Sequence, residues 1–137
     1  MDNPSKIEER LQELEDSEKI RQRLAEFFVA IDSKDVGRLS AQLTEDVEFI
    51  WLQNRWVGKK AIAEFYSGFF QQYPNAYHVT GNVIVKCQGE VATATAYWVW
   101  FADGKQIKMW GHDEYRLRKE ANVWKVKEAR VVPALEF

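Results

Sequence analysis

The chain has 137 residues and a mass of 16.1 kDa, which is the size of one domain and too short for two ordinary ones. Hydrophobic residues make up 46% and charged residues 29%, a composition typical of a globular protein and not of a disordered one. The near balance of 19 Lys and Arg against 21 Asp and Glu argues against a nucleic-acid partner, and the single cysteine, Cys87, excludes an internal disulfide framework and a multi-cysteine zinc site.

The start of the chain is charged from its first residues and carries no apolar core followed by a cleavage site, so it does not resemble a signal peptide. No stretch approaches the roughly 18 apolar residues that a membrane-spanning helix requires. We therefore expect a cytoplasmic protein with no membrane partner.

Helical periodicity begins close to the N-terminus. Ser5 and Glu8 have the spacing of a capping box, and apolar residues then recur every three or four positions. The pattern predicts helices over 5–15 and 16–33, or one kinked rod. A single domain over the whole chain, 1–137, is expected, with residues 1–16 as a helical extension: a solvated face, a lid or a dimer arm.

Strand patterns follow, interrupted by one more helix. Asp35 can cap a short third helix, and apolar residues alternate from Val47 to Trp51 as in a half-buried strand. Helical spacing returns at Lys59 and ends before Tyr73. Four strand-like runs come after it, over residues 78–86, 91–101, 107–117 and 123–132. Helices followed by an antiparallel meander predict an α+β fold, with the helices packed on one face of a curved sheet.

Six segments resemble the SnoaL-like, nuclear-transport-factor-2-like superfamily, in the order and spacing of that family. They are Ile31–Leu39 with Leu43–Val47, Gly58–Ile62, Tyr77–Asn82, Gly89–Ala92, Asp113–Tyr115 and Val123–Val126. The resemblance covers nearly the whole chain. It implies a cystatin-like α+β barrel, a cone of bent antiparallel strands with helices over its concave face, commonly dimeric. The fold hosts enzymes and non-enzymes, so function has to come from the site.

Within the superfamily the sequence is most similar to scytalone dehydratase and hexachlorocyclohexane dehydrochlorinase. In both, an aspartate near the end of the long helix orients a histidine that acts as the base of an elimination. Asp32 and His78 stand at these two positions. The resemblance therefore implies a cofactor-independent, lyase- or isomerase-type enzyme, in which His78 takes a proton from a hydrophobic cyclic or aromatic substrate.

Other positions depart from these relatives. Ile31 stands where the dehydratase has a carbonyl-polarising tyrosine, and no second pocket histidine falls near residues 98–101. Phe27 replaces a lysine of the dehydrochlorinase. Phe49 falls where ketosteroid isomerase, another relative, carries its base, with Glu48 beside it. The general base thus carries over, whereas the electrophilic side of the known mechanisms does not.

The residues alone leave plainer explanations open for the two dyad positions. His78 could be a strand histidine satisfied by a local hydrogen bond, and Asp32 could belong to ordinary capping chemistry between helices. As a catalytic pair they would form the base and orienting group of a triad without its nucleophile. Two histidines without clustered carboxylates predict no metal site.

Two further residues are candidates for the chemistry. The family lines its pocket from the positions of Asp113 and Tyr115, so Asp113 is a second candidate acid or base, and His112 would face outward. Arg130 shares a strand face with Trp124 unless a bulge intervenes. It could bind a carboxylate or a developing oxyanion, or pair with a nearby acid.

The aromatic content, 19 residues in 137, exceeds what packing alone usually needs. Tyr97, Val99 and Phe101 alternate with Trp98 and Trp100, so both faces of this strand are apolar, and one set is expected in the interface of a homodimer or higher homo-oligomer. Core packing is the alternative for each of the remaining rings. The candidates for lining a substrate pocket are Phe27, Phe28, Trp51, Trp56, Phe65, Phe69 and Tyr115.

A non-catalytic role is the rival hypothesis, because the same fold serves as a ligand carrier and as a subunit-assembly module. A pocket with Asp32 hydrogen-bonded to His78 would favour the enzyme. A pocket filled by the protein's own Phe and Trp rings, with His78 detached, would favour the module.

Overall fold

Two helices open the chain, and a six-stranded sheet interrupted by a third helix forms the rest. The computed structural model describes residues 3–103 and 106–136. Its elements are α1 (Pro4–Asp32), α2 (Val36–Ala41), β1 (Leu43–Trp51), β2 (Asn54–Val57), α3 (Lys59–Gln72), β3 (Tyr77–Gln88), β4 (Val91–Ala102), β5 (Gln106–Glu120) and β6 (Val123–Glu136). None of the helices in this described part is long and apolar enough to cross a bilayer.

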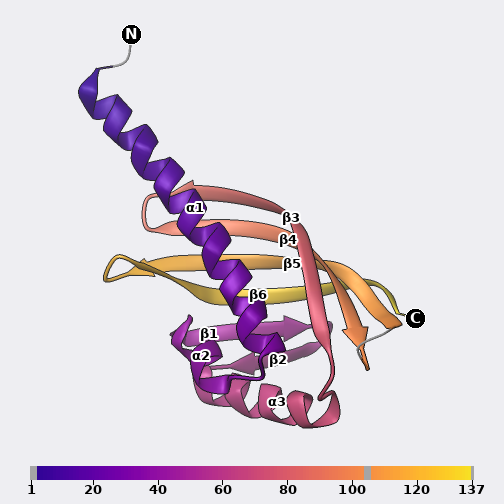
Figure 1. Cartoon of the computed structure of the whole chain (residues 1–137). Coiled ribbons are helices and arrows are strands. Elements are labelled where there is room, and N and C mark those ends of the chain that lie inside the picture. The colour runs from indigo at the N-terminus through magenta and orange to yellow at the C-terminus, as the bar shows by residue number, and fades with distance from the viewer. Residues whose placement is uncertain (1–2, 104–105, 137) are drawn as a thin grey trace.

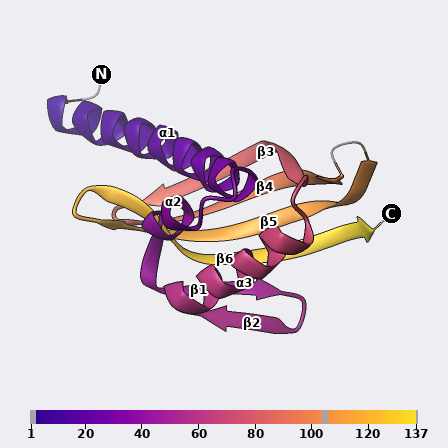
Figure 2. The same cartoon turned by 60° about the horizontal axis from the view of Figure 1, so that its bottom comes forward.

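The sheet is strongly curved and unclosed (Figures 1 and 2). Its strand order is β2-β1-β6-β5-β4-β3, so β2 and β3 form its two edges. The α+β class and the antiparallel meander from β3 to β6 are as predicted. One pairing differs from the all-antiparallel cone, since β1 lies parallel to β6. A parallel pair needs a long connection, which the intervening strands and α3 provide.

Helix α1 runs without a break from Pro4 to Asp32, so of the two alternatives the single rod is correct and the division into two helices near residue 16 is wrong. The buried carboxylate of Asp16, in the middle of this helix, accepts hydrogen bonds from the Trp124 indole and the Lys119 ammonium, both 3.0 Å away, and so fixes the helix to β5 and β6. The helix also begins earlier than the capping box predicted. Asn3 is the N-cap and accepts from the amide of Lys6 at 2.9 Å. Pro4 follows it, and its fixed φ suits the first helical position.

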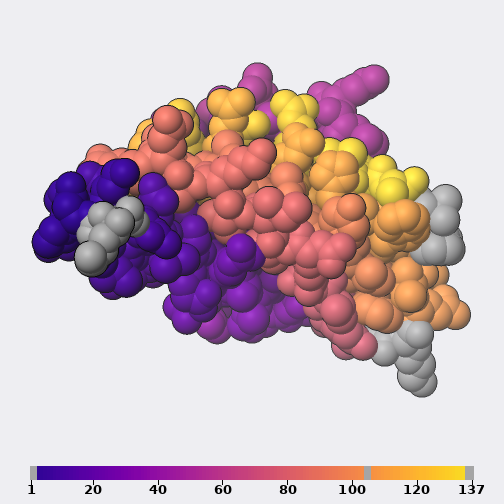
Figure 3. All heavy atoms as spheres, turned by 90° about the horizontal axis from the view of Figure 1, so that it is seen from above, coloured from indigo at the N-terminus to yellow at the C-terminus, as the bar shows by residue number. Residues whose placement is uncertain are grey.

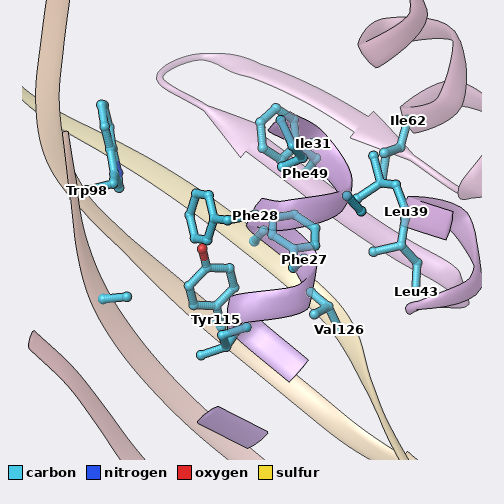
Figure 4. Close-up of a cluster of buried hydrophobic side chains, with 14 of the residues drawn as sticks. Phe27, Phe28, Ile31, Leu39, Leu43, Phe49, Ile62, Trp98, Tyr115 and Val126 are labelled. Carbon is cyan, nitrogen blue, oxygen red and sulfur yellow. The ribbon is translucent and has the colours of Figure 1, made fainter. Parts of the chain in front are cut away.

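The first turns of α1 extend past the edge of the sheet at one end of the molecule (Figures 1 and 3). From Ile20 onward one stripe of the helix is buried against the sheet, including Leu24 and Phe27. Figure 4 shows Phe27, Phe28 and Ile31 reaching from α1 into the core that also contains Tyr115. The helix thereby covers the concave face of the sheet.

The end of α1 is a tight, hydrogen-bonded turn. The amide of Lys34 donates to the carbonyl of Ile31 at 3.0 Å, and the amide of Asp35 donates to that of Ala30 at 3.1 Å, the pattern of a Schellman motif. Lys34 adopts the left-handed conformation, φ 59°, that this motif requires. Asp35 then caps α2, as predicted, by accepting from the amide of Arg38 at 2.9 Å.

The two faces of β4 differ in burial. Trp98 and Trp100 point inward and are buried, whereas Tyr97 is 56% exposed on the outer face. Strand pairing places Val79 and Trp110 on that outer face with Val99. Of the two aromatic sets on this strand, the outward one is thus available for an interface between subunits.

Candidate functional site

His78 and Asp32 meet where the end of α1 passes the start of β3. The Nδ1 atom of His78 lies 2.7 Å from Oδ1 of Asp32, and the backbone amide of His78 donates to Oδ2 at 3.0 Å. Lys34 helps to hold the two elements together, since its ammonium donates to the carbonyls of Asp32 and Ala76 at 3.3 and 3.5 Å. The same carboxylate therefore fixes both the ring and the backbone of His78.

This geometry determines which nitrogen of His78 can act as a base. A neutral imidazole that bonds a carboxylate through Nδ1 carries its proton there, which leaves the lone pair on Nε2. The side chain of His78 is 15% exposed and lines the pocket described below. Nε2 is thus the acceptor that His78 can offer to a bound molecule.

Asp32 lies where a negative charge is unfavourable, and its hydrogen bonds with His78 compensate for this. Asp32 is the last residue of α1, where the helix dipole opposes a negative charge by about 0.3–1 kcal/mol. It caps neither neighbouring helix, because Ser33 is the C-cap of α1 and Asp35 is the N-cap of α2. Two hydrogen bonds from His78 offset this cost, so the ordinary capping explanation for Asp32 does not fit the structure.

A second acid lies deeper in the same pocket. Asp113 is buried and accepts hydrogen bonds from the indole of Trp98 at 2.9 Å and from the hydroxyl of Tyr115 at 2.6 Å. Burial raises the pKa of Asp113 to about 6, although the hydrogen bond from Tyr115, the charge of His78 and the hydrogen bond from Trp98 each lower it. Near neutral pH this carboxyl can exchange a proton, unlike an ordinary aspartate.

Aromatic side chains form most of the pocket between α1, α3 and the sheet. About 530 Å³ lies between the lining atoms and at the mouth, but only about 40 Å³ of it is open to the centre of a water-sized molecule. The space is therefore narrow, and it is called the slot below. Its lining residues are Phe27, Phe28, Ile31, Phe49, Trp51, Phe65, Tyr66, Phe69, His78, Trp98, Trp100, Met109, Asp113, Ala129 and Val131.

Comparison with known proteins identifies the family. The family model of the SnoaL-like domain matches residues 12–130. The chain belongs to the SnoaL-like family. This confirms the resemblance seen in the sequence, which also covers nearly the whole chain. No curated protein matches the chain in sequence.

Solved structures of similar fold include enzymes and proteins of unknown function. An NTF2-like protein with a cystatin-like fold from Novosphingobium aromaticivorans is 26% identical, with a TM-score of 0.89, and covers 98% of this chain and 92% of its own. A proposed scytalone dehydratase from the same species is 15% identical, with a TM-score of 0.83 and coverage of 91% and 88%. The type-3 hexachlorocyclohexane dehydrochlorinase from Novosphingobium barchaimii is 12% identical, with a TM-score of 0.83 and coverage of 93% and 92%.

Five of the seven aromatic residues expected at the pocket of this SnoaL-like protein line it: Phe27, Phe28, Trp51, Phe65 and Phe69. The other two do not line the slot but pack against residues that do. The ring centre of Trp56 is 4.5 Å from that of Phe65, and Tyr115 packs behind Phe27 at 6.1 Å. Sequence reasoning missed Trp98 and Trp100 as lining residues, because alternation alone does not tell which face of β4 is inside.

The prediction that Arg130 enters the pocket is wrong. Arg130 is exposed on the outer face, whereas its neighbours Ala129 and Val131 line the slot. The reason is a bulge in β6: Leu117 pairs with Val126, but Arg116 pairs with Glu128. The extra residue, Lys127, reverses which side chains face inward beyond that point.

The remaining titratable residues considered in the sequence, His112 and Glu48, both point away from the slot. His112 faces outward, as predicted, with Nε2 3.5 Å from the carboxylate of Glu114. At the first strand, Phe49 lines the pocket, while Glu48 faces away and accepts from Arg55 at 2.6 Å. Among the described residues, no group of three or more His, Cys, Asp and Glu side chains is arranged to hold a metal ion.

Proposed function

We propose that this SnoaL-like protein is a small, cofactor-independent lyase- or isomerase-type enzyme that removes a proton from a hydrophobic cyclic or aromatic molecule. The observation that carries the proposal is the 2.7 Å contact between His78 and Asp32 at the wall of an aromatic slot. The dehydratase and dehydrochlorinase names of two structural neighbours agree with this class of reaction.

The proposed reaction begins at Nε2 of His78. This atom takes a proton from carbon, and Asp32 stabilises the imidazolium that forms. The electron pair of the broken C–H bond either expels a leaving group from the next carbon or moves onto a conjugated carbonyl. His78 then returns its proton to the departing hydroxide or to another carbon, so that elimination and isomerisation both balance without an oxidant.

Asp113 is proposed as the second acid–base group. Its raised pKa of about 6 allows a protonated fraction near neutrality, and it lines the slot beside Trp98, to which it is hydrogen-bonded. In the protonated state it can donate to a leaving group, while Tyr115 behind it keeps the carboxyl oriented. Aromatic walls keep Asp113 away from water and would favour flat, apolar substrates.

The binding-only alternative rests on the width of the slot. With only about 40 Å³ open to water-sized molecules, the rings of Phe65 and Phe69 fill part of the space that a substrate would need. A module of this kind would bind apolar ligands and change no bond in them.

Nuclear magnetic resonance in heavy water separates the two functions. The purified protein is mixed with 2-tetralone, cyclohexenone and a cyclic β-hydroxy ketone, and loss of the carbon-bound proton or of water is followed. We expect exchange or elimination with at least one compound. Saturable binding of these compounds without any exchange, isomerisation or elimination would favour the module.

A further inference from the structure

The indole N–H of Trp100 is buried without a hydrogen-bond acceptor. Three buried side-chain atoms of the described residues lack a partner, on Gln42, Thr44 and Trp100, and of these residues only Trp100 lines the slot. Leaving a buried donor unsatisfied is costly, because the group loses its hydrogen bond to water and gains none in the protein. Such a group needs an explanation, and a bound molecule that supplies the acceptor is one.

Trp98, two residues earlier on the same face, provides the contrast. Its indole donates to Asp113 at 2.9 Å, so this N–H is already committed within the protein. The nearest rings to Trp100 are those of Phe69 at 5.8 Å and Tyr73 at 4.9 Å. The Tyr73 ring stands at 86° to the indole, and an aromatic face is at best a weak acceptor. Among residues 3–103 and 106–136, Trp100 is thus a donor that no protein oxygen satisfies.

The sheet places this donor beside the proposed base. His78 and Trp100 are directly paired between β3 and β4, and directly opposite residues of an antiparallel pair have Cβ atoms about 4.5–5.5 Å apart on one face. Both side chains line the slot. A molecule held there would therefore contact both side chains.

We infer that Trp100 is the electrophilic group of the site, donating its indole N–H to a carbonyl oxygen of the substrate as that oxygen becomes anionic. This inference rests on the proposed function and narrows it to planar substrates with an oxygen conjugated to the acidic carbon. His78 breaks the C–H bond and takes the proton, the electron pair moves to the oxygen, and the hydrogen bond from Trp100 strengthens as charge develops. The electrophile that the sequence comparison did not locate is supplied by β4.

A pair of matched ligands tests the donor without knowledge of the natural substrate. Pentafluorophenolate resembles a planar enolate, and hexafluorobenzene has the same shape with fluorine in place of the oxygen anion. Fluorine NMR titration gives the dissociation constants for wild type, for Trp100→Phe and for Trp110→Phe. The last variant is the matched control, because Trp110 is 41% exposed on the outer face.

Loss of a hydrogen bond to a charged oxygen should weaken pentafluorophenolate binding by about tenfold or more in Trp100→Phe. Hexafluorobenzene should bind equally to all three proteins, and Trp110→Phe should match wild type for both ligands. Equal affinity of wild type and Trp100→Phe for pentafluorophenolate, or no preference of wild type for it over hexafluorobenzene, would overturn the inference. If Trp100→Phe does not fold, 3-benzothienylalanine at this position removes the N–H with little change of shape.

The outcome is separable from that of the proposed function. A tenfold effect at Trp100 with no proton transfer to His78 would leave an oxygen-binding site in a non-catalytic module. Proton transfer by His78 without any effect at Trp100 would keep the enzyme and remove its proposed electrophile.

Discussion

At the scale of single residues, burial and hydrogen bonding decide what each polar group of the slot can do. Asp113 accepts from Trp98 and Tyr115 and has a raised pKa, whereas the indole N–H of Trp100 finds no acceptor in the part of the chain that the structure describes. The dyad of Asp32 and His78 was predictable from the family resemblance. The bond between Trp98 and Asp113 was not, because it depends on the register of β4 against β5, which no local pattern encodes.

The raised pKa of Asp113 predicts how stability changes with pH. Its pKa is about 6 in the folded protein against an ordinary value of 3.8. Between these values the folded state holds a proton that the unfolded chain has lost. The free energy of unfolding therefore falls as the pH rises from about 4 to about 6, by up to about 3 kcal/mol from this group.

Urea unfolding of wild type and Asp113→Asn at pH 4 and pH 7 measures this contribution. The variant keeps an oxygen that can accept from Trp98 but cannot titrate. Relative to the variant, wild type should lose stability between the two pH values. An identical pH dependence of the two proteins would show that Asp113 titrates normally.

At the scale of elements, hydrophobic periodicity predicted the type and order of nearly every helix and strand, but it did not predict the β-bulges. The bulge at Lys127 has no Gly or Pro to mark it, and it turned Arg130 outward. A second register shift separates Trp110 from Gly111 and brings Gly111 opposite Pro133. Such shifts arise from how neighbouring strands fit together, which is why alternation within one strand does not reveal them.

Gly111 is required by this second shift. A Cβ atom at Gly111 would lie against the carbonyl oxygen of Val132 and 2.9 Å from Cα of Pro133, and backbone cannot move away as a side-chain end can. Gly111→Ala should lower the free energy of unfolding by about 1–3 kcal/mol. Gly81→Ala is the control, because an added Cβ there meets nothing within 4 Å. Chemical denaturation compares the two, and equal stabilities would contradict this reading of the shift.

At the scale of the whole molecule, helices cover only one face of the sheet. The outer face carries a patch of apolar side chains where β3 starts, β4 ends and β5 starts. Its members are Tyr77, Val79, Tyr97, Val99, Phe101, Ile107 and Trp110. Several of these are 40–56% exposed in the single chain. Contiguous apolar surface of this kind marks a contact between proteins. The composition had indicated an aromatic surplus, and the structure divides it between this patch and the slot.

We predict that two copies of the chain associate through this outer patch. Tyr97→Lys places a charge at its centre and should convert the dimer to a monomer in size-exclusion chromatography with light scattering. Thr93→Lys adds the same charge to the same face of β4, four residues from Tyr97, and should leave the dimer intact. A monomeric wild type, or equal behaviour of the two variants, would contradict the prediction.

If His78 is the base of a proton-transfer enzyme, its Nε2 atom removes a proton from carbon inside the slot. The most direct measurement is the rate at which 2-tetralone exchanges its acidic carbon-bound protons for deuterium in heavy water, for wild type, His78→Gln and the outer-face control His112→Gln. Removing a positioned general base should slow the exchange by about 100-fold or more, while His112→Gln should exchange at the wild-type rate. Exchange by His78→Gln within twofold of wild type would contradict the account.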